Sequence, residues 1–364
     1  MIENLIIHIG TEKTGSSTLQ KFLVENRLVL MSAGYGVLES TGADNDRSLA
    51  AYCLPLDSRD DFFKDKLILN VRDRLKFNVD FVRKFDSELA EIGEAVHTVI
   101  ITSEHFHSRL VSEESIRFLS EFVASRFNRV KVVSYFREQS ALLLSYYSTA
   151  VKTSSVEDFE AFSERCHTES LYFNYYKMFS LWRAVFGAEN IVARIYDRNK
   201  LVGGDIRKDF VDVLSLDVQN LGYSSNDINT SLGGVGINLI RIINRSFPRY
   251  DKNFKLDLYR LRLVQAISEL AISRTGEISF LVAVDIYENF SSSNIRFSEE
   301  FLGSSLNPFS APKINDDSNQ VEISESDLYE LIEVVVRVTS QKHDSKKSYY
   351  FYLKALMNKL FFNR

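Results

Sequence analysis

The amino-acid sequence predicts an α/β fold in which a doubly wound, mainly parallel sheet is flanked by helices. Two observations carry this prediction. Short runs rich in valine and isoleucine, typical of buried parallel strands, alternate with amphipathic stretches of helical period. Each run is also followed by glycine or polar residues. Sheets of this kind bind ligands at the carboxyl ends of their strands, which is where these residues would lie. The four predicted strands are Leu5–Ile9, Val96–Thr102, Val130–Phe136 and Ile191–Tyr196.

Helices are expected between and after these strands. Glu113–Phe127 is the clearest, because its apolar residues recur at helical spacing and Ser112 before it is a suitable N-cap. Charged residues fill Asp57–Ala95, which we expect to form one or two helices, and Gly233–Gly236 is expected to be a loop entering a helix. Three further helices are predicted in the C-terminal third, over Leu256–Arg274, Glu277–Phe290 and Ser324–Thr339.

The 364 residues are predicted to form a domain over 1–303, a linker over 304–318 and C-terminal helices over 319–364. Within the domain, the sequence indicates a core over 1–215 and a helical extension over 216–303. The linker is placed where two prolines stand among small polar residues.

Composition narrows the class of protein. Hydrophobic residues make up 45% of the chain and charged residues 26%, as in globular proteins with a substantial core. The net charge of −5 argues against nucleic-acid binding through overall electrostatics, so an anionic ligand needs a local cluster of cations. Cys53 and Cys166 lack metal-ligand spacing, and no signal peptide or membrane-length apolar run is evident. We therefore expect a cytoplasmic protein in a reducing compartment.

The stretch Ile6–Gln20 carries the most chemical information. A strand, a glycine turn with a lysine, a run of hydroxyl residues and a helix follow one another in the sequence IIHIGTEKTGSSTLQ. This order points backbone N–H groups and the positive end of the helix dipole at an anion, so it predicts a phosphate-binding loop. A Walker A loop places its lysine directly before Ser or Thr, whereas Lys13 stands before the second glycine, Gly15.

This arrangement resembles the 5′-phosphosulfate loop of sulfotransferases that use 3′-phosphoadenosine 5′-phosphosulfate (PAPS), in particular the bacterial carbohydrate-type enzymes of P-loop fold. The resemblance is clear over residues 5–200 and faint as far as 303, where Asn229–Leu232 and Ser293–Asn294 are similar but suggest no role. It implies that the donor's 5′-phosphosulfate is bound by Lys13, Thr14, Gly15, Ser16, Ser17 and Thr18.

A second motif lies at the end of the third predicted strand. Arg137 ends that strand, and Ser145 follows about two helical turns along the next helix. An arginine fork beside a hydroxyl group is a suitable monophosphate clamp, and the resemblance implies that this pair binds the 3′-phosphate. Where the family often has proline after the arginine, this chain has Glu138–Gln139. Taken alone, Arg137 fits an ion pair with an acidic neighbour equally well, and Ser145 fits a bond to its own helix backbone.

The stretch IITSEHFH, Ile100–His107, supplies the candidate general base. A carboxylate beside the phosphate loop is well placed to accept a proton, and several carbohydrate sulfotransferases use a glutamate for this. We choose Glu104, with His105 and His107 as rivals. If the strand continued to Phe106, Glu104 would lie on one face and both histidines on the other. Alternatively Glu104 caps the next helix or pairs with a basic residue. A metal site is not expected here, because consecutive residues rarely surround one ion.

Tyr196 is the last residue of the fourth predicted strand, in the stretch IVARIYDRNK. It follows a segment ending in Phe186–Gly187, and the resemblance implies that Tyr196 binds near the adenine of the donor. A tyrosine that only fills the core is the competing interpretation.

A basic amphipathic segment lies at the C-terminus. Six basic residues between Lys342 and Arg364 accompany a single acid, Asp344, and apolar residues recur at helical spacing. Such a helix either docks on the acidic body of the protein or on a partner, or lies on an anionic membrane surface. Contact with the inner face of the membrane would suit an enzyme acting on lipid-linked polysaccharide.

By the resemblance that these motifs carry, the chain is expected to be a sulfotransferase that moves the sulfuryl group of PAPS to a hydroxyl of a carbohydrate acceptor, a cell-surface polysaccharide or glycolipid. In this scheme Glu104 removes the acceptor proton and Lys13 stabilises the leaving phosphate, with no metal. Two alternatives stay open. One is a P-loop ATP-dependent kinase or nucleotide triphosphatase, and the other is a catalytically inactive nucleotide-binding scaffold protein.

Overall fold

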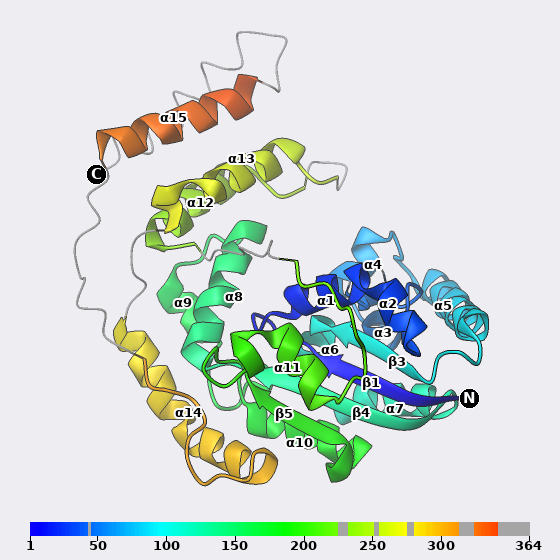
Figure 1. Ribbon diagram of the computed structural model, residues 1–364. Coiled ribbons are helices and arrows are strands. Elements are labelled where there is room, and N and C mark those ends of the chain that lie inside the picture. The colour runs from blue at the N-terminus through cyan, green and yellow to red at the C-terminus, as the bar shows by residue number, and fades with distance from the viewer. Residues whose placement is uncertain (43–44, 225–231, 251–254, 275–279, 313–323, 341–364) are drawn as a thin grey trace. The chain divides into compact units, whose positions relative to one another are not determined.

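Figure 1 shows the computed structural model, which describes residues 1–42, 45–224, 232–250, 255–274, 280–312 and 324–340. The chain divides into two compact units. The first comprises Met1–Leu142, Cys166–Asp227 and Asp285–Ala311, and the second comprises Leu143–Arg165, Ile228–Val284 and Pro312–Arg364. The domain limits expected from the sequence, at residues 303 and 318, stay predictions.

The first unit contains a five-stranded parallel sheet with strand order β2-β3-β1-β4-β5, which confirms the predicted α/β class. The four predicted strands are present with shifted ends, and a short edge strand was missed. The strands are β1 Ile2–Ile9, β2 Tyr35–Val37, β3 Thr98–Ser103, β4 Phe127–Phe136 and β5 Ile191–Ile195.

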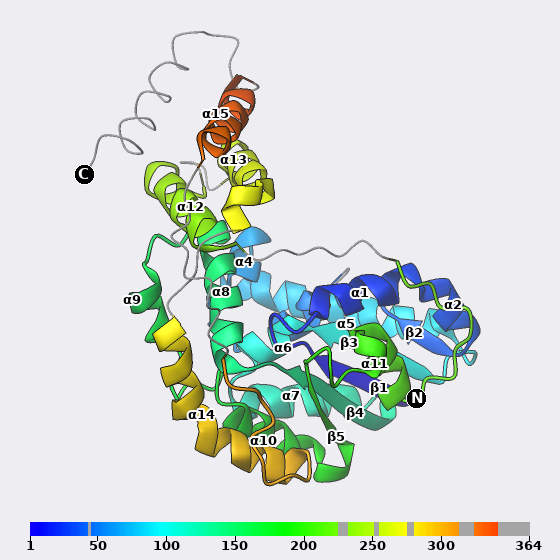
Figure 2. The same cartoon turned by 60° about the vertical axis from the view of Figure 1, so that its left-hand side comes forward.

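Helices cover both faces of this sheet, which explains why its central strands are apolar on both sides. On one face α1 (Ser16–Glu25) and α11 (Ile206–Val213) pack against Ile6 and its neighbours in a buried cluster. On the other, α7 (Glu113–Ala124) and α10 (Tyr175–Phe186) lie together, and Phe136 of β4 packs its ring against Phe179 of α10. Figures 1 and 2 show these two helical layers.

The predicted helices are confirmed with local corrections. Ser112 caps α7 by accepting from the N–H of Ser115, but α7 ends at Ala124 because Phe127 already begins β4. The charged segment forms α4 and α5. The loop expected over Gly233–Gly236 is shorter, because α12 already begins at Gly234. The remaining helices are α2 Arg27–Ser32, α3 Arg47–Tyr52, α4 Asp61–Asp65, α5 Val71–Ile92, α6 Glu104–Arg109, α8 Gln139–Thr153, α9 Phe159–Ser163, α12 Gly234–Ser246, α13 Leu258–Glu269, α14 Phe280–Phe301 and α15 Glu325–Ser340.

The second unit is helical. Apolar side chains of α12, α13 and α15 face one another, and a partly buried polar contact joins α13 to α12, where Arg260 Nη2 donates to Asn244 Oδ1 at 2.6 Å. The amide of Asn244 in turn donates to the carbonyl of Val151 in α8 at 2.7 Å. Within the described ranges, no helix is both long and apolar enough to cross a membrane.

Several sequence predictions fall outside the described residues. These are the basic segment from Lys342 to Arg364, residues 313–318 of the predicted linker, the start of the helix predicted from Glu277, and most of Asn229–Leu232. They stay predictions.

A buried carboxylate, Asp46, accepts a backbone hydrogen bond at the end of β3. Strand β2 pairs with β3 only as far as Val37 opposite Ile100, so it does not reach the last residues of β3. The N–H of Thr102 donates instead to Asp46 Oδ2 at 2.6 Å, and the Thr41 hydroxyl donates to the other oxygen. Burial raises the pKa of Asp46 to about 7, although both hydrogen bonds act in the opposite direction.

This raised pKa predicts a pH-dependent stability. Because the ordinary pKa of aspartate is 3.8, the folded protein keeps a proton on Asp46 that the unfolded chain loses. The contribution of Asp46 to the free energy of unfolding therefore falls as pH rises from about 4 to about 7, by at most about 1.4 kcal/mol per pH unit. We expect Asp46→Asn to remove this contribution, measured by urea denaturation at pH 5 and pH 7.

The informative quantity is the difference between variant and wild type. His8, His105 and His107 have pKa values lowered by burial and contribute the opposite slope in both proteins. Asp61→Asn, at an exposed position on α4, is the matched control. Identical pH slopes in Asp46→Asn and wild type would contradict the prediction.

Candidate functional site

The loop between β1 and α1 leaves no room for side chains at its glycines. A Cβ on Gly10 would lie 2.6 Å from Ser16 Oγ and 3.2 Å from the backbone nitrogen of Glu104. Gly15 adopts φ +78°, and Lys13 adopts φ +69°, a strained conformation for a residue with a side chain. Such strain is retained where the surrounding structure fixes it, commonly at functional sites.

Hydroxyl groups within the loop fix its shape. Thr14 Oγ1 donates to the carbonyl of Thr11 at 2.6 Å, Ser16 Oγ donates to the same carbonyl at 3.3 Å, and the Thr11 hydroxyl donates to the carbonyl of Tyr135 in β4. Thr14 and Ser16 are buried, whereas Ser17 is exposed. The side chains of Thr14 and Ser16 are therefore used to hold the loop, which leaves the backbone to face a ligand.

The N-terminus of α1 has no side-chain cap, because its N-cap residue is Gly15. By contrast, Ser103, Ser112 and Asn174 cap α6, α7 and α10 through their side chains. The first N–H groups of a helix have no partner within it and carry the positive end of the helix dipole. The start of α1 thus presents N–H groups without a side-chain cap, an arrangement that suits an anion.

Two cations stand beside this helix end. Arg137, directly after β4, donates from Nη1 to the carbonyl of Lys13 at 3.3 Å. Burial lowers the pKa of Lys13; Glu12 and Glu104 raise it, and Arg137 lowers it. The two nearby carboxylates are engaged elsewhere: Tyr172 donates to Glu12 at 2.8 Å, and Glu104 accepts from another side chain. Among the described residues, neither Lys13 nor Arg137 forms an ion pair.

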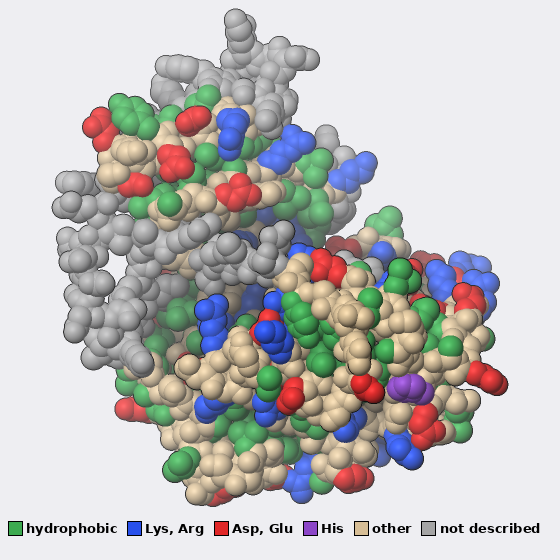
Figure 3. Space-filling view, in the orientation of Figure 1, with side chains coloured by type: hydrophobic (Ala, Val, Ile, Leu, Met, Phe, Trp, Pro, Cys, Tyr) green, Lys and Arg blue, Asp and Glu red, His purple; other side chains and the backbone are tan. Residues whose placement is uncertain are grey.

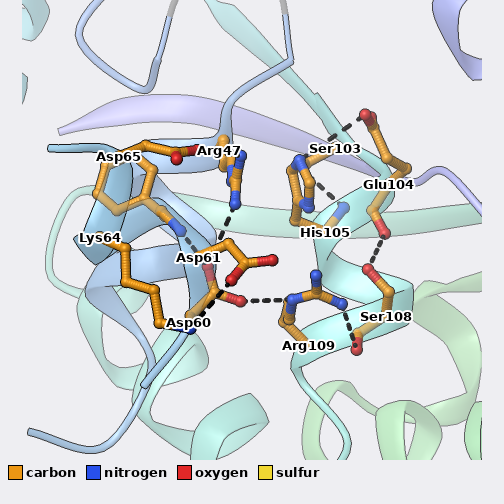
Figure 4. Close-up of polar contacts among 11 residues, drawn as sticks. Arg47, Asp60, Asp61, Lys64, Asp65, Ser103, Glu104, His105, Ser108 and Arg109 are labelled. Atoms are coloured by element: carbon orange, nitrogen blue, oxygen red, sulfur yellow. Dashed lines mark hydrogen bonds and ion pairs between the residues drawn. The ribbon is translucent and has the colours of Figure 1, made fainter. Parts of the chain in front are cut away.

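Glu104 lies at the same edge of the sheet, as the first residue of α6. The strand stops at Ser103 instead of continuing to Phe106, so the predicted alternation of faces is wrong. The cause is the Ser103 side chain, which accepts from the N–H of His105 at 3.3 Å and starts a helix. Figure 4 shows Glu104 and His105 side by side at this helix start. The Glu104 carboxylate is half-buried and accepts a hydrogen bond of 2.7 Å from Gln20 Nε2.

The two rival histidines differ in their surroundings. His107 is fully buried, its Nε2 lies 2.9 Å from the carbonyl of Tyr172, and burial lowers its pKa to about 4. His105 has Nε2 3.7 Å from Glu104 Oε1, and burial together with Arg47 and Arg109 lowers its pKa to about 4. Both imidazoles are therefore neutral at neutral pH.

An ion-pair cluster that the sequence did not indicate adjoins His105. Asp60, at the start of α4, bridges Arg47 at 3.3 Å and Arg109 at 2.5 Å, as Figure 4 shows. The three residues come from α3, the turn before α4 and the end of α6. No local pattern in the sequence links them, because only the folded chain brings these segments together.

Tyr196 also reaches the loop between β1 and α1. A Cβ on Gly15 would lie 3.1 Å from the ring and hydroxyl of Tyr196, which packs partly buried against the core cluster of α1. Its predicted contact with adenine stays a prediction. Ser145 lies in the part of α8 that belongs to the second unit, and its predicted pairing with Arg137 also stays a prediction.

Comparison with known proteins gives distant similarities. No family model matches the chain. An uncharacterised protein of Archaeoglobus fulgidus is 28% identical over 209 residues, which are 56% of this chain and 54% of that protein. The chain thus spans about half the length of this relative. A crystal structure of a sulfotransferase from Alicyclobacillus acidocaldarius matches with a TM-score of 0.39 and 14% identity, over 63% of this chain and 87% of that one. At this level the similarity assigns no activity to this chain.

The packing of Tyr196 against Gly15 is testable through two glycines of similar backbone conformation. Gly15 and Gly303 have φ of +78° and +68°, but only at Gly15 would a Cβ meet other atoms. We expect Gly303→Ala to lower the free energy of unfolding by about 1 kcal/mol through backbone strain alone. Gly15→Ala should lower it by at least about twice as much, measured by urea denaturation. Equal losses would argue against the contact.

Proposed function

We propose that this protein transfers the sulfuryl group of PAPS to a hydroxyl group of a carbohydrate acceptor, a cell-surface polysaccharide or glycolipid. One observation carries the proposal: the uncapped start of α1 lies beside two cations, Lys13 and Arg137, that have no ion-pair partner among the described residues. On the face drawn in Figure 3, described basic and acidic side chains intermingle, so positive charge for an anion is supplied locally.

The chemistry of the residues fits a donor with two separate phosphate groups. The glycines and the N–H groups of α1 suit the 5′-phosphosulfate, which must approach the backbone closely. Arg137, with Ser145 as the proposed partner, is assigned to the 3′-phosphate, the group that distinguishes this donor from ATP. Tyr196 is assigned to the adenine edge.

In the proposed reaction Glu104 accepts the proton of the acceptor hydroxyl. The acceptor oxygen then forms a bond to sulfur while the bond between sulfur and the 5′-phosphate oxygen breaks. The negative charge that develops on the leaving phosphate is stabilised by Lys13 and by the N–H groups at the start of α1, whose positions are set before the reaction. The carbohydrate acceptor is chosen because the candidate base is a glutamate, by analogy with carbohydrate-type enzymes.

Nucleotide protection tests the donor assignment. We expect 3′-phosphoadenosine 5′-phosphate to raise the melting temperature more than ADP with Mg²⁺. Arg137→Ala and Lys13→Ala should each lower the affinity for 3′-phosphoadenosine 5′-phosphate about 10- to 100-fold, as for the loss of a charged hydrogen bond. Lys131→Ala, at an exposed site on β4, is the control and should bind like wild type. Stronger protection by ADP with Mg²⁺ would instead favour the kinase alternative.

Substitution of the candidate base separates chemistry from binding. Glu104→Gln should keep the nucleotide affinity within about twofold, because glutamine has the same shape and can still accept from Gln20. Its rate of sulfuryl transfer from ³⁵S-labelled PAPS, to water and to a panel of bacterial polysaccharides, should fall about 10²- to 10⁴-fold. Glu113→Gln on the exposed surface of α7 is the matched control. If His105→Ala abolished transfer and Glu104→Gln did not, the base would be His105. Nucleotide protection without transfer to any acceptor would favour the scaffold alternative.

A further inference from the structure

A buried amide joins the donor-binding helix to the candidate base. The side chain of Gln20 is 5% exposed, and its Nε2 donates to Glu104 Oε2 at 2.7 Å. Gln20 lies four residues after Ser16 on α1, so both lie on the same face of the helix that follows the phosphate loop. A buried amide N–H requires an acceptor, and here the acceptor is the carboxylate itself.

The second oxygen of Glu104 is held more loosely. The neutral imidazole of His105 has its Nε2 3.7 Å from this oxygen, which is beyond hydrogen-bond length. Within the described ranges, Gln20 thus supplies the hydrogen bond that fixes the carboxylate, and it does so at one oxygen. Oε1 remains the oxygen that can accept a proton.

We propose that Gln20 is a positioning residue that orients the Glu104 carboxylate for proton abstraction. This inference rests on the proposed function. The amide restrains Oε2, and Oε1 is left to face the acceptor hydroxyl. Because Gln20 stands on α1, the same rigid helix sets both the site of the 5′-phosphosulfate and the direction of the base. A neutral amide can do this without a positive charge that would compete with the acceptor for the carboxylate.

The test uses Gln20→Met, which keeps the length and volume of the side chain but cannot donate a hydrogen bond. Sulfuryl transfer from ³⁵S-labelled PAPS to water serves as a readout that needs no identified acceptor. We expect Gln20→Met to lower kcat about 10- to 100-fold, as for a misoriented catalytic group. The affinity for 3′-phosphoadenosine 5′-phosphate should stay within about twofold of wild type. Lys21→Met, at the next, half-exposed position of α1, where Lys21 pairs with Glu25, is the control.

A double-mutant cycle distinguishes positioning from a structural effect. When Gln20→Met is added to Glu104→Gln, kcat should fall by less than about a further twofold, because the carboxylate that Gln20 positions is already absent. A further loss as large as that of the single variant would overturn the proposal, as would an equal loss of nucleotide affinity in Gln20→Met. Absence of nucleotide protection in wild type would instead refute the proposed function and with it this inference.

Discussion

The connection between β1 and α1 constrains the rest of the site, because the chain must turn there with almost no space. Gly10 lies against Ser16 and the backbone of Glu104, so the loop, the helix start and the end of β3 fit together only without a Cβ. The hydroxyl of Thr11 fastens the same loop to β4. Three adjacent strands are thereby tied at their carboxyl ends, and the N–H groups of α1 are directed outward.

Electrostatics reinforces this geometry. Partial burial disfavours the charge of Lys13, and the nearby Arg137 adds to this cost. Glu12 and Glu104 raise the pKa of Lys13 and so partly offset this cost, but they form their hydrogen bonds with Tyr172 and Gln20 and make no ion pair with Lys13 within the described ranges. Such an arrangement is unfavourable for the protein alone and becomes favourable when an anion binds. The charge distribution therefore supports a ligand site more strongly than a structural ion-pair network would.

The sequence predicted the elements whose signal is local. Runs of β-branched residues identified four strands, and the polar residues after them identified the edge where Lys13, Glu104, Arg137 and Tyr196 meet. Strand β2 was missed because three residues that include a glycine give no periodic pattern. The start of α6 was misplaced because the Ser103 cap overrides the apolar alternation. Contacts such as Gln20 with Glu104 depend on how α1 packs over β3, which no local pattern encodes.

The two sides of the site are built differently. The side assigned to the donor consists of backbone: the glycine loop, the start of α1 and the ends of central strands. The side around His105 depends on side-chain pairs, with Asp46 holding the end of β3 and Asp60 joining two arginines from separate helices. Backbone geometry suits one invariant ligand, whereas side-chain pairs can be exchanged without altering the sheet. Under the proposed function, this division leads us to expect the donor on the backbone side and acceptor specificity in α3, α4 and α6.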